Sequence, residues 1–193
     1  GGGGGGPPGG GGPALLSAAR AFGAGTNRSV QKRETGLVDM CGVVVSDLGK
    51  SLAFYQDVVG FSEVEGFKVG GDFPKLVGLT DGAPLTIHVL VLGKDETATK
   101  LKIMQVKGQK PSRVIKQKFI HTATWFSYLS IFVTDVDAVL ERAKKAGHKP
   151  YAQSPQRLPE GLPQDVCLLM LKDPDGNFVE IIGPLTKKLQ KAK

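Results

Sequence analysis

The sequence predicts an α+β fold made of two tandem modules, each ordered strand–helix–strand–strand–strand. Three observations support this prediction. A β-rich run followed by an amphipathic helical stripe occurs twice, 88 residues apart. The other apolar runs are only strand-sized. The segment D-P-D-G-N at 173–177 has the proline and glycine of a tight turn and joins the last two predicted strands as a hairpin.

The first module begins with a β-rich run from Val38 to Val45 and continues into a short helix. Asp47 is the expected N-cap, because its short carboxylate can accept from an orphan N–H of the first turn. Gly60 ends the helix, since glycine readily takes a positive φ. The apolar stripe consists of Leu48, Leu52, Tyr55 and Val59. The elements expected next are strands at Glu63–Lys68, Leu85–Leu92 and Leu101–Val106, with a helical turn around Pro74–Leu79.

The second module repeats this pattern. A strand ends at Val133, Asp135 is the expected N-cap, and Gly147 ends the helix. The helical stripe consists of Val136, Leu140 and Ala143. The remaining strands are expected at Lys149–Ala152, Val166–Leu171 and Phe178–Ile182. A repeat of this kind is a fold-level signal, because one unit alone could not bury its apolar face.

Charge and composition divide the chain into five parts. Residues 1–36, rich in glycine, proline, alanine and arginine, are expected to be disordered. The first module spans 37–106, a basic connector 107–125, the second module 126–185 and a basic tail 186–193. Of the net charge of +7, residues 1–36 carry +3 and residues 187–193 carry +4, so the core is neutral. Nucleic-acid binding by the core is therefore not expected.

The composition also indicates in which cellular compartment the protein is expected. Cys41 and Cys167 cannot make a disulfide scaffold or a four-thiolate zinc site, and both are expected to be buried thiols in strands. No apolar run is long enough for a membrane span, so we expect a soluble intracellular protein. Residues 13–33 lack acids and are rich in alanine, serine and arginine. This composition fits either a plastid or mitochondrial transit segment or a plain linker.

Few other residues indicate chemistry. His88 lies in a predicted strand and is either a neutral, hydrogen-bonded histidine or a base that lines a cleft. His121 and His148 are expected at the surface. Neither a nucleophile elbow nor a Walker phosphate loop is present. Phe54, Tyr55 and Phe61 are expected in the core rather than in a ligand platform.

Two segments resemble a known family: V-V-V-S-D-L-G-K-S-L-A-F-Y-Q-D-V-V-G-F and D-P-D-G-N-F-V-E-I-I. They are similar to the vicinal oxygen chelate superfamily, which includes glyoxalase I, extradiol dioxygenases and bleomycin-resistance proteins. The resemblance covers about 37–185. It implies two βαβββ modules whose strands form a curved mixed sheet around a central cleft. It does not define an activity, because one fold hosts many chemistries.

The resemblance also implies four metal-ligand positions, on the first and last strands of each module. In this sequence they are occupied by Met40, Lys102, Tyr128 and Glu180. Only Glu180 is an ordinary ligand for a hard or borderline divalent ion. A thioether is a poor ligand for such ions, a phenol is ordinarily protonated, and an ammonium repels the cation. We therefore expect a family member with no metal and no other cofactor.

A replacement for the metal follows from the same four positions. Lys102 and Glu180 are expected to form an ion pair in the cleft, with the Tyr128 hydroxyl hydrogen-bonded to one of them. The alternative is a strand register shifted by one residue, which would turn both charges toward solvent.

Three functions remain open from the sequence. The first is a glyoxalase-like protein that binds a small anionic or polar organic ligand in its cleft through Met40, Lys102, Tyr128 and Glu180. The second is a glyoxalase-like lyase or isomerase with Glu180 as its catalytic base. The third is a non-catalytic subunit of a larger, organellar assembly, tethered by its basic tails. A homodimer is compatible with each of them.

Overall fold

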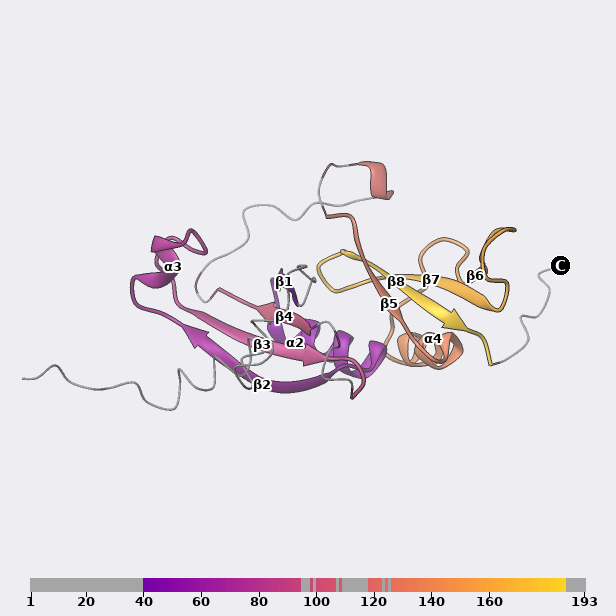
Figure 1. Ribbon diagram of the computed structural model, residues 1–193, viewed down its shortest axis with the longest axis horizontal. Coiled ribbons are helices and arrows are strands. Elements are labelled where there is room, and N and C mark those ends of the chain that lie inside the picture. The colour runs from indigo at the N-terminus through magenta and orange to yellow at the C-terminus, as the bar shows by residue number, and fades with distance from the viewer. Residues whose placement is uncertain are drawn as a thin grey trace, which may run out of the picture. The chain divides into compact units, whose positions relative to one another are not determined.

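The computed structural model describes residues 40–94, 98, 100–106, 108, 118–122, 124 and 126–186. The predicted terminal segment 1–36, most of the connector and residues 187–193 lie outside these ranges. The elements are β1 Met40–Val44, α2 Leu48–Ala53, η1 Phe54–Val59, β2 Ser62–Val69, α3 Phe73–Leu76, β3 Leu85–Val91, β4 Lys100–Met104, η2 Ile120–Thr122, β5 Tyr128–Phe132, α4 Val136–Lys145, β6 Gln156–Arg157, β7 Val166–Lys172 and β8 Phe178–Pro184 (Figure 1).

The predicted α+β class with repeated modules is confirmed. The strands form two four-stranded sheets, in the orders β1-β4-β3-β2 and β5-β8-β7-β6. In both, the module's first strand lies beside its last strand, so the two halves share one topology. In the second sheet, β5 and β8 are parallel, and β7 is antiparallel to both β8 and β6.

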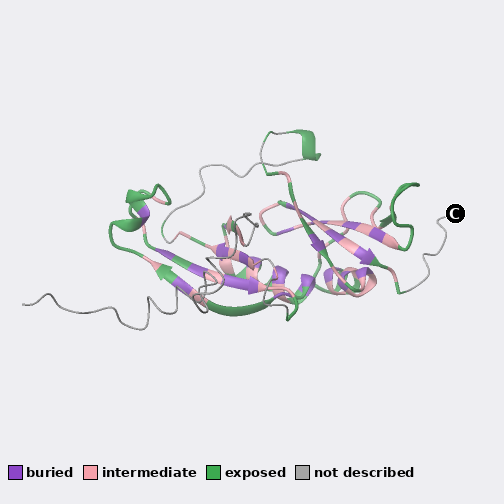
Figure 2. Cartoon of the chain, viewed as in Figure 1, coloured by how far each residue is buried: buried purple, intermediate pink, exposed green. Residues whose placement is uncertain are grey.

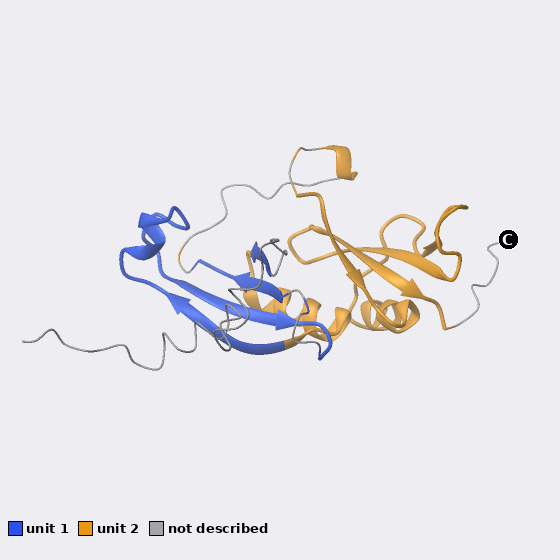
Figure 3. Ribbon diagram, in the orientation of Figure 1, with its two compact units in different colours: residues 1–43, 63–107 blue, residues 44–62, 108–193 orange. Residues whose placement is uncertain are grey.

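The chain divides into two compact units that do not coincide with the modules in sequence. One unit comprises Gly1–Val43 and Glu63–Lys107, and the other Val44–Ser62 and Gly108–Lys193 (Figure 3). The helical segment of the first module thus belongs to the same compact unit as the second sheet. The predicted module boundaries stay predictions.

Both predicted helix starts are confirmed. The Asp47 carboxylate accepts a hydrogen bond from the Lys50 N–H at 3.1 Å, and the Asp135 carboxylate accepts one from the Ala138 N–H at 3.0 Å. Gly60 ends the first helical segment with a φ of 107°, which glycine adopts without steric cost. The repeated S/T-D pair before each apolar stripe therefore fixes where the helices begin.

The first helical segment is not a uniform α-helix. It becomes π-helical at η1, where the Tyr55 carbonyl accepts from the N–H groups of both Gly60 and Phe61. This wider turn places Phe54, Tyr55 and Val58 in the core, each 1% exposed, whereas Leu52 is only half-buried. The predicted core positions of Phe54, Tyr55 and Phe61 are confirmed, and the predicted 3.6-residue stripe is correct only in part.

The end of η1 is held by α4. Arg142 donates from Nε to the Val58 carbonyl at 2.8 Å and from its guanidinium to the Val59 carbonyl at 3.2 Å. These two carbonyls belong to a helix end, where intrahelical donors are lacking. The Arg142 side chain therefore links α4 to the end of the first helical segment, within the unit that contains the second sheet.

The predicted hairpin at 173–177 is confirmed and its first residue is buried. Gly176 has a φ of 86°, and its N–H donates to the Asp173 carbonyl at 2.9 Å. The Asp173 carboxylate, 4% exposed, accepts from the Tyr55 hydroxyl, the side-chain amide of Asn177 and the N–H groups of Asp175 and Asn177, at 2.8–3.1 Å. The turn motif and the helical motif are thus joined by one buried hydrogen-bond network.

Burial raises the pKa of Asp173 above its ordinary value of 3.8, although its hydrogen-bond donors act in the opposite direction. The folded chain therefore holds this proton more tightly than the unfolded chain. Its contribution to stability is full below pH 3.8 and is lost as the pH rises through the folded-state pKa. In urea titrations, we expect wild type to become more stable relative to Asp173→Asn as the pH falls from neutral. A difference independent of pH would contradict this.

Ser51 on α2 is fully buried, and its hydroxyl has no hydrogen-bond partner within the part of the chain that the structure describes. An unsatisfied buried hydroxyl costs about 1–3 kcal/mol. Ser51→Ala is therefore expected to raise the free energy of unfolding by about 1 kcal/mol, since alanine is also the better helix former. Ser51→Thr, which keeps the hydroxyl and adds a methyl group, should destabilise. Urea unfolding measures both, and a destabilised alanine variant would show that the hydroxyl is satisfied.

One predicted strand is wrong. Residues 149–152 are not a strand. The edge strand of the second sheet is instead the two-residue β6 at Gln156–Arg157. Pro150 has no N–H to donate, and Ala152 has a φ of 55°, which takes the backbone out of the extended region. The Tyr151 N–H still donates to the Met170 carbonyl at 2.7 Å, so the segment runs beside β7 without forming a ladder.

Burial follows the sheets and helices, as Figure 2 shows. Cys167 is buried as predicted, whereas Cys41 is only half-buried. His121 is exposed as expected, but His148 is half-buried with its ring 4.9 Å from that of Phe54. Within the described ranges, no helix has the length and hydropathy needed to cross a membrane.

Candidate functional site

One face of the second sheet carries two of the four predicted site residues. The strand register aligns three rows across β5, β8 and β7, and in each row the side chains point to the same face. The rows are Tyr128–Phe178–Lys172, Ser130–Glu180–Met170 and Phe132–Ile182–Leu168. The opposite face holds the buried residues Ile131, Val179, Ile181, Cys167, Leu169 and Leu171. Glu180 thus lies at the centre of the first face.

Glu180 is held by a serine that has no motif in the sequence. The Ser130 hydroxyl donates to Oε2 of Glu180, its direct register partner on β5. Tyr128 lies on the same face but pairs with Phe178, one row away. The predicted hydrogen bond from the Tyr128 hydroxyl stays a prediction. The signal that could have identified Ser130 is its spacing of two from Tyr128, which puts both on one side of a strand.

A cation also belongs to this face. The Lys172 ammonium lies 4.5 Å from the ring centroid of Tyr151 and 4.6 Å from that of Phe178. The two rings meet edge to face at 5.1 Å. An ammonium above aromatic faces is attracted by the ring quadrupoles. Lys172 therefore supplies a positive charge one row from the Glu180 carboxylate, at a position that the sequence did not indicate.

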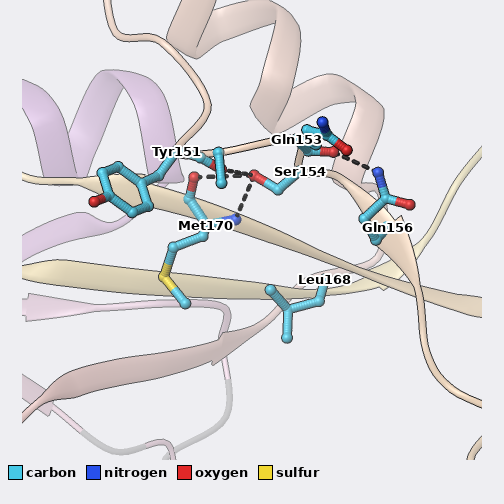
Figure 4. A pocket seen from close by; sticks show the side chains of 7 residues that line it. Tyr151, Gln153, Ser154, Gln156, Leu168 and Met170 are labelled. Atoms are coloured by element: carbon cyan, nitrogen blue, oxygen red, sulfur yellow. Dashed lines mark hydrogen bonds between the residues drawn. The ribbon is translucent and has the colours of Figure 1, made fainter. Parts of the chain in front are cut away.

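A cavity of about 540 Å³ opens beside this face. Its lining comprises Tyr151, Ala152, Gln153, Ser154, Gln156, Leu168 and Met170 (Figure 4). Met170 is the register partner of Glu180, and Leu168 is two residues further along β7. Because these side chains share the face of Glu180, the cavity and the carboxylate are neighbours on one surface. The volume lies within the range of about 300–1,000 Å³ usual for small-molecule sites.

The other two predicted site residues belong to the first sheet. Lys102 on β4 is half-buried and pairs with the buried Val89 of β3. Met40 lies on β1, the neighbour of β4. A Cβ added to Gly42 would lie 3.5 Å from the Met104 side chain, so Met40 and Gly42 share the face of Lys102 and Met104. This face also holds a core cluster of Phe67, Leu85, Ile87 and Val89.

His88 lies on the other face of the first sheet. Its register partner is Ile103, one residue from Lys102, so the two side chains point to opposite faces. The His88 Nδ1 atom lies 2.6 Å from Oε1 of Glu63. The predicted hydrogen-bonded strand histidine is therefore confirmed, and His88 does not share the face of Met40 and Lys102.

Two four-stranded sheets with the same strand order define a protein of tandem βαβββ modules. The chain belongs to the Glyoxalase/Bleomycin resistance protein/Dioxygenase superfamily, whose sequence profile matches residues 37–181. The predicted family is thus confirmed. No curated protein sequence matches the chain.

Solved structures share the fold at low sequence identity. A glyoxalase family protein from Bacillus cereus is 16% identical with a TM-score of 0.60, over 79% of this chain and 97% of that chain. Glyoxalase I from Zea mays is 19% identical with a TM-score of 0.55, over 78% of this chain and 45% of that chain. A glyoxylase/bleomycin resistance protein/dioxygenase domain from Frankia sp. is 19% identical with a TM-score of 0.54, over 78% and 99%. At these sequence identities, the similarity shows a shared fold.

The residues at the four predicted metal-ligand positions do not suit a divalent metal by their chemistry. On the second sheet, Glu180 is the only carboxylate of its face's three rows, and it already accepts from Ser130. On the first sheet, the corresponding residues are a thioether and an ammonium, neither of which suits a hard or borderline ion. No group of three histidine, cysteine or acidic side chains gathers as a metal site among the residues that the structure describes.

Proposed function

We propose that this protein binds a small anionic or polar organic ligand on the Glu180 face, without a divalent metal. The observation that carries the proposal is the register pair of Met170 and Glu180, which puts a ligand-sized cavity next to a carboxylate fixed by Ser130. Lys172 on the same face supplies the opposite charge. The site therefore offers an acceptor and a cation beside an apolar hollow, which suits recognition of a polar molecule with an apolar part.

Lys102 is proposed as a further cation for an acidic group of the ligand. Its support is the positive charge of its ammonium and its half-buried place on β4, on the sheet face that also holds Val89 and Met104. The ion pair of Lys102 with Glu180 stays a prediction. A double-mutant cycle of Lys102→Met and Glu180→Gln tests it, because non-interacting sites give additive changes in stability.

The experiment for this function is a thermal-shift screen of metabolites in a buffer containing a chelator. A ligand at about 100 times its Kd stabilises the folded state by about 2.7 kcal/mol. Glu180→Gln should remove the shift, whereas Glu160→Gln, at an exposed acid of the β6–β7 loop, should keep it. A ligand shift that appears only after a divalent metal is added would contradict the metal-free proposal.

The lyase or isomerase alternative is tested with the same protein samples. It rests on Glu180, the one proton acceptor among the four predicted positions. Turnover of a hemithioacetal substrate by wild type, abolished in Glu180→Gln, would replace ligand binding by catalysis as the function. Ligand binding without turnover supports the proposal.

A further inference from the structure

We infer that the cavity beside Glu180 takes an uncharged, flat and largely apolar part of the ligand that carries one hydrogen-bond donor. The inference rests on the proposed function, since it names the chemistry of the ligand at that site. It assigns the polar or charged part of the ligand to the Glu180 row and the apolar part to the cavity.

The lining excludes a charged group. None of the seven lining residues is charged, and Leu168, Met170 and Ala152 present hydrocarbon or thioether surface (Figure 4). A charged group placed against this surface would lose its water without gaining a partner. Lys172, the nearest cation by register, contacts the rings of Tyr151 and Phe178 instead of lining the cavity.

The aromatic wall of the cavity is fixed in place. The Tyr151 hydroxyl donates to the Lys118 carbonyl, and its backbone N–H donates to the Met170 carbonyl at 2.7 Å. The ring is further held edge to face by Phe178 and from above by the Lys172 ammonium. A rigid aromatic ring favours a planar partner that stacks on it or meets its edge, because little side-chain freedom remains to be lost on binding.

The polar rim offers an acceptor to a hydrogen-bond donor of the ligand. The Ser154 hydroxyl is already used within the protein: it donates to the Tyr151 carbonyl, lies 3.2 Å from the Met170 carbonyl and accepts from the Met170 N–H (Figure 4). The Gln156 amide is oriented by donation from Nε2 to the Gln153 carbonyl. That bond uses one of the two N–H groups of the amide, and the carbonyl oxygen of the same amide can accept from an N–H or O–H of the ligand.

The probe for this inference is 1-aminoanthracene, a planar fluorophore that is uncharged at neutral pH and carries one N–H donor group. Its anionic counterpart, anthracene-1-carboxylate, has the same ring system. We expect the amine to bind more tightly than the carboxylate. Leu168→Gln should weaken binding of the amine about tenfold by loss of apolar contact. Leu162→Gln makes the same change at an exposed position of the β6–β7 loop outside the cavity and should have no effect.

A second variant covers the case in which Leu168→Gln does not fold. Gln156→Leu changes an exposed residue and should weaken binding of the amine about fivefold, through loss of one hydrogen bond. Equal binding by the Leu168 and Leu162 variants, an unchanged Gln156 variant, or tighter binding of the carboxylate would overturn the inference. A Glu180-dependent ligand from the metabolite screen, together with no binding of 1-aminoanthracene, would overturn this inference alone. No binding in either experiment would overturn the proposed function as well.

Discussion

Asp173→Ala is expected to lower the free energy of unfolding by about 3–5 kcal/mol. The carboxylate is 4% exposed and accepts four hydrogen bonds, from Tyr55, Asp175 and, twice, Asn177. Alanine would leave these donors buried without acceptors. The loss should therefore exceed that of an ordinary surface substitution several-fold, and urea unfolding followed by circular dichroism measures it.

Two further variants make this test specific. Tyr55→Phe removes only one donor from the network and should cost about 1–2 kcal/mol. Asp165→Ala, at an exposed acid before β7, should change stability by no more than about 0.5 kcal/mol. If Asp173→Ala is no more destabilising than Asp165→Ala, the buried network does not hold the helical segment to the hairpin.

Gly183→Ala is expected to destabilise the protein by about 2–3 kcal/mol, through overpacking. A Cβ at this position would lie 2.2 Å from the Val133 carbonyl oxygen, which is backbone and cannot rotate away. The strands β5 and β8 would have to separate near the end of their parallel pairing, where the Val133 N–H donates to the Ile182 carbonyl at 2.8 Å. Stability measurement and amide hydrogen exchange of β5 would report this change.

Gly42→Ala is the matched control. This glycine is also in a strand, but an added Cβ would meet only the Met104 side chain, at an ordinary 3.5 Å. Alanine in a strand interior is favoured over glycine by about 0.5–1 kcal/mol, so Gly42→Ala should be neutral or stabilising. A Gly183→Ala variant as stable as Gly42→Ala would contradict the close backbone approach.

The sequence was informative wherever a local rule decides the structure. Asp47 and Asp135 cap helices because a carboxylate can reach an N–H three residues on, and Gly60 and Gly176 take positive φ because they lack a Cβ. Strands with a clear apolar alternation were also predicted within a few residues. These features depend on neighbours in the chain, which the sequence displays directly.

The site was less predictable, because it depends on register between distant segments. Ser130 meets Glu180 across 50 positions in the sequence. Tyr151, which meets Phe178 and Lys172, belongs to residues 149–152, which do not form the predicted strand. The π-helical turn that buries Phe54 and Tyr55 likewise has no periodic signal. The family resemblance identified Glu180 and Tyr128 as residues of one face, but not the serine, the aromatic pair or the cavity beside them.

We propose that the predicted metal-ligand position at Glu180 has become part of a metal-free ligand site. The most direct measurement is metal content after equilibration of the full chain with Zn²⁺, Ni²⁺ and Mn²⁺, by elemental analysis of wild type and Glu180→Gln. We expect substoichiometric metal and no difference between the two proteins, because Met40, Lys102 and Tyr128 add no suitable donor to the single carboxylate of the four predicted positions. One equivalent of metal bound by wild type and lost in Glu180→Gln would contradict it.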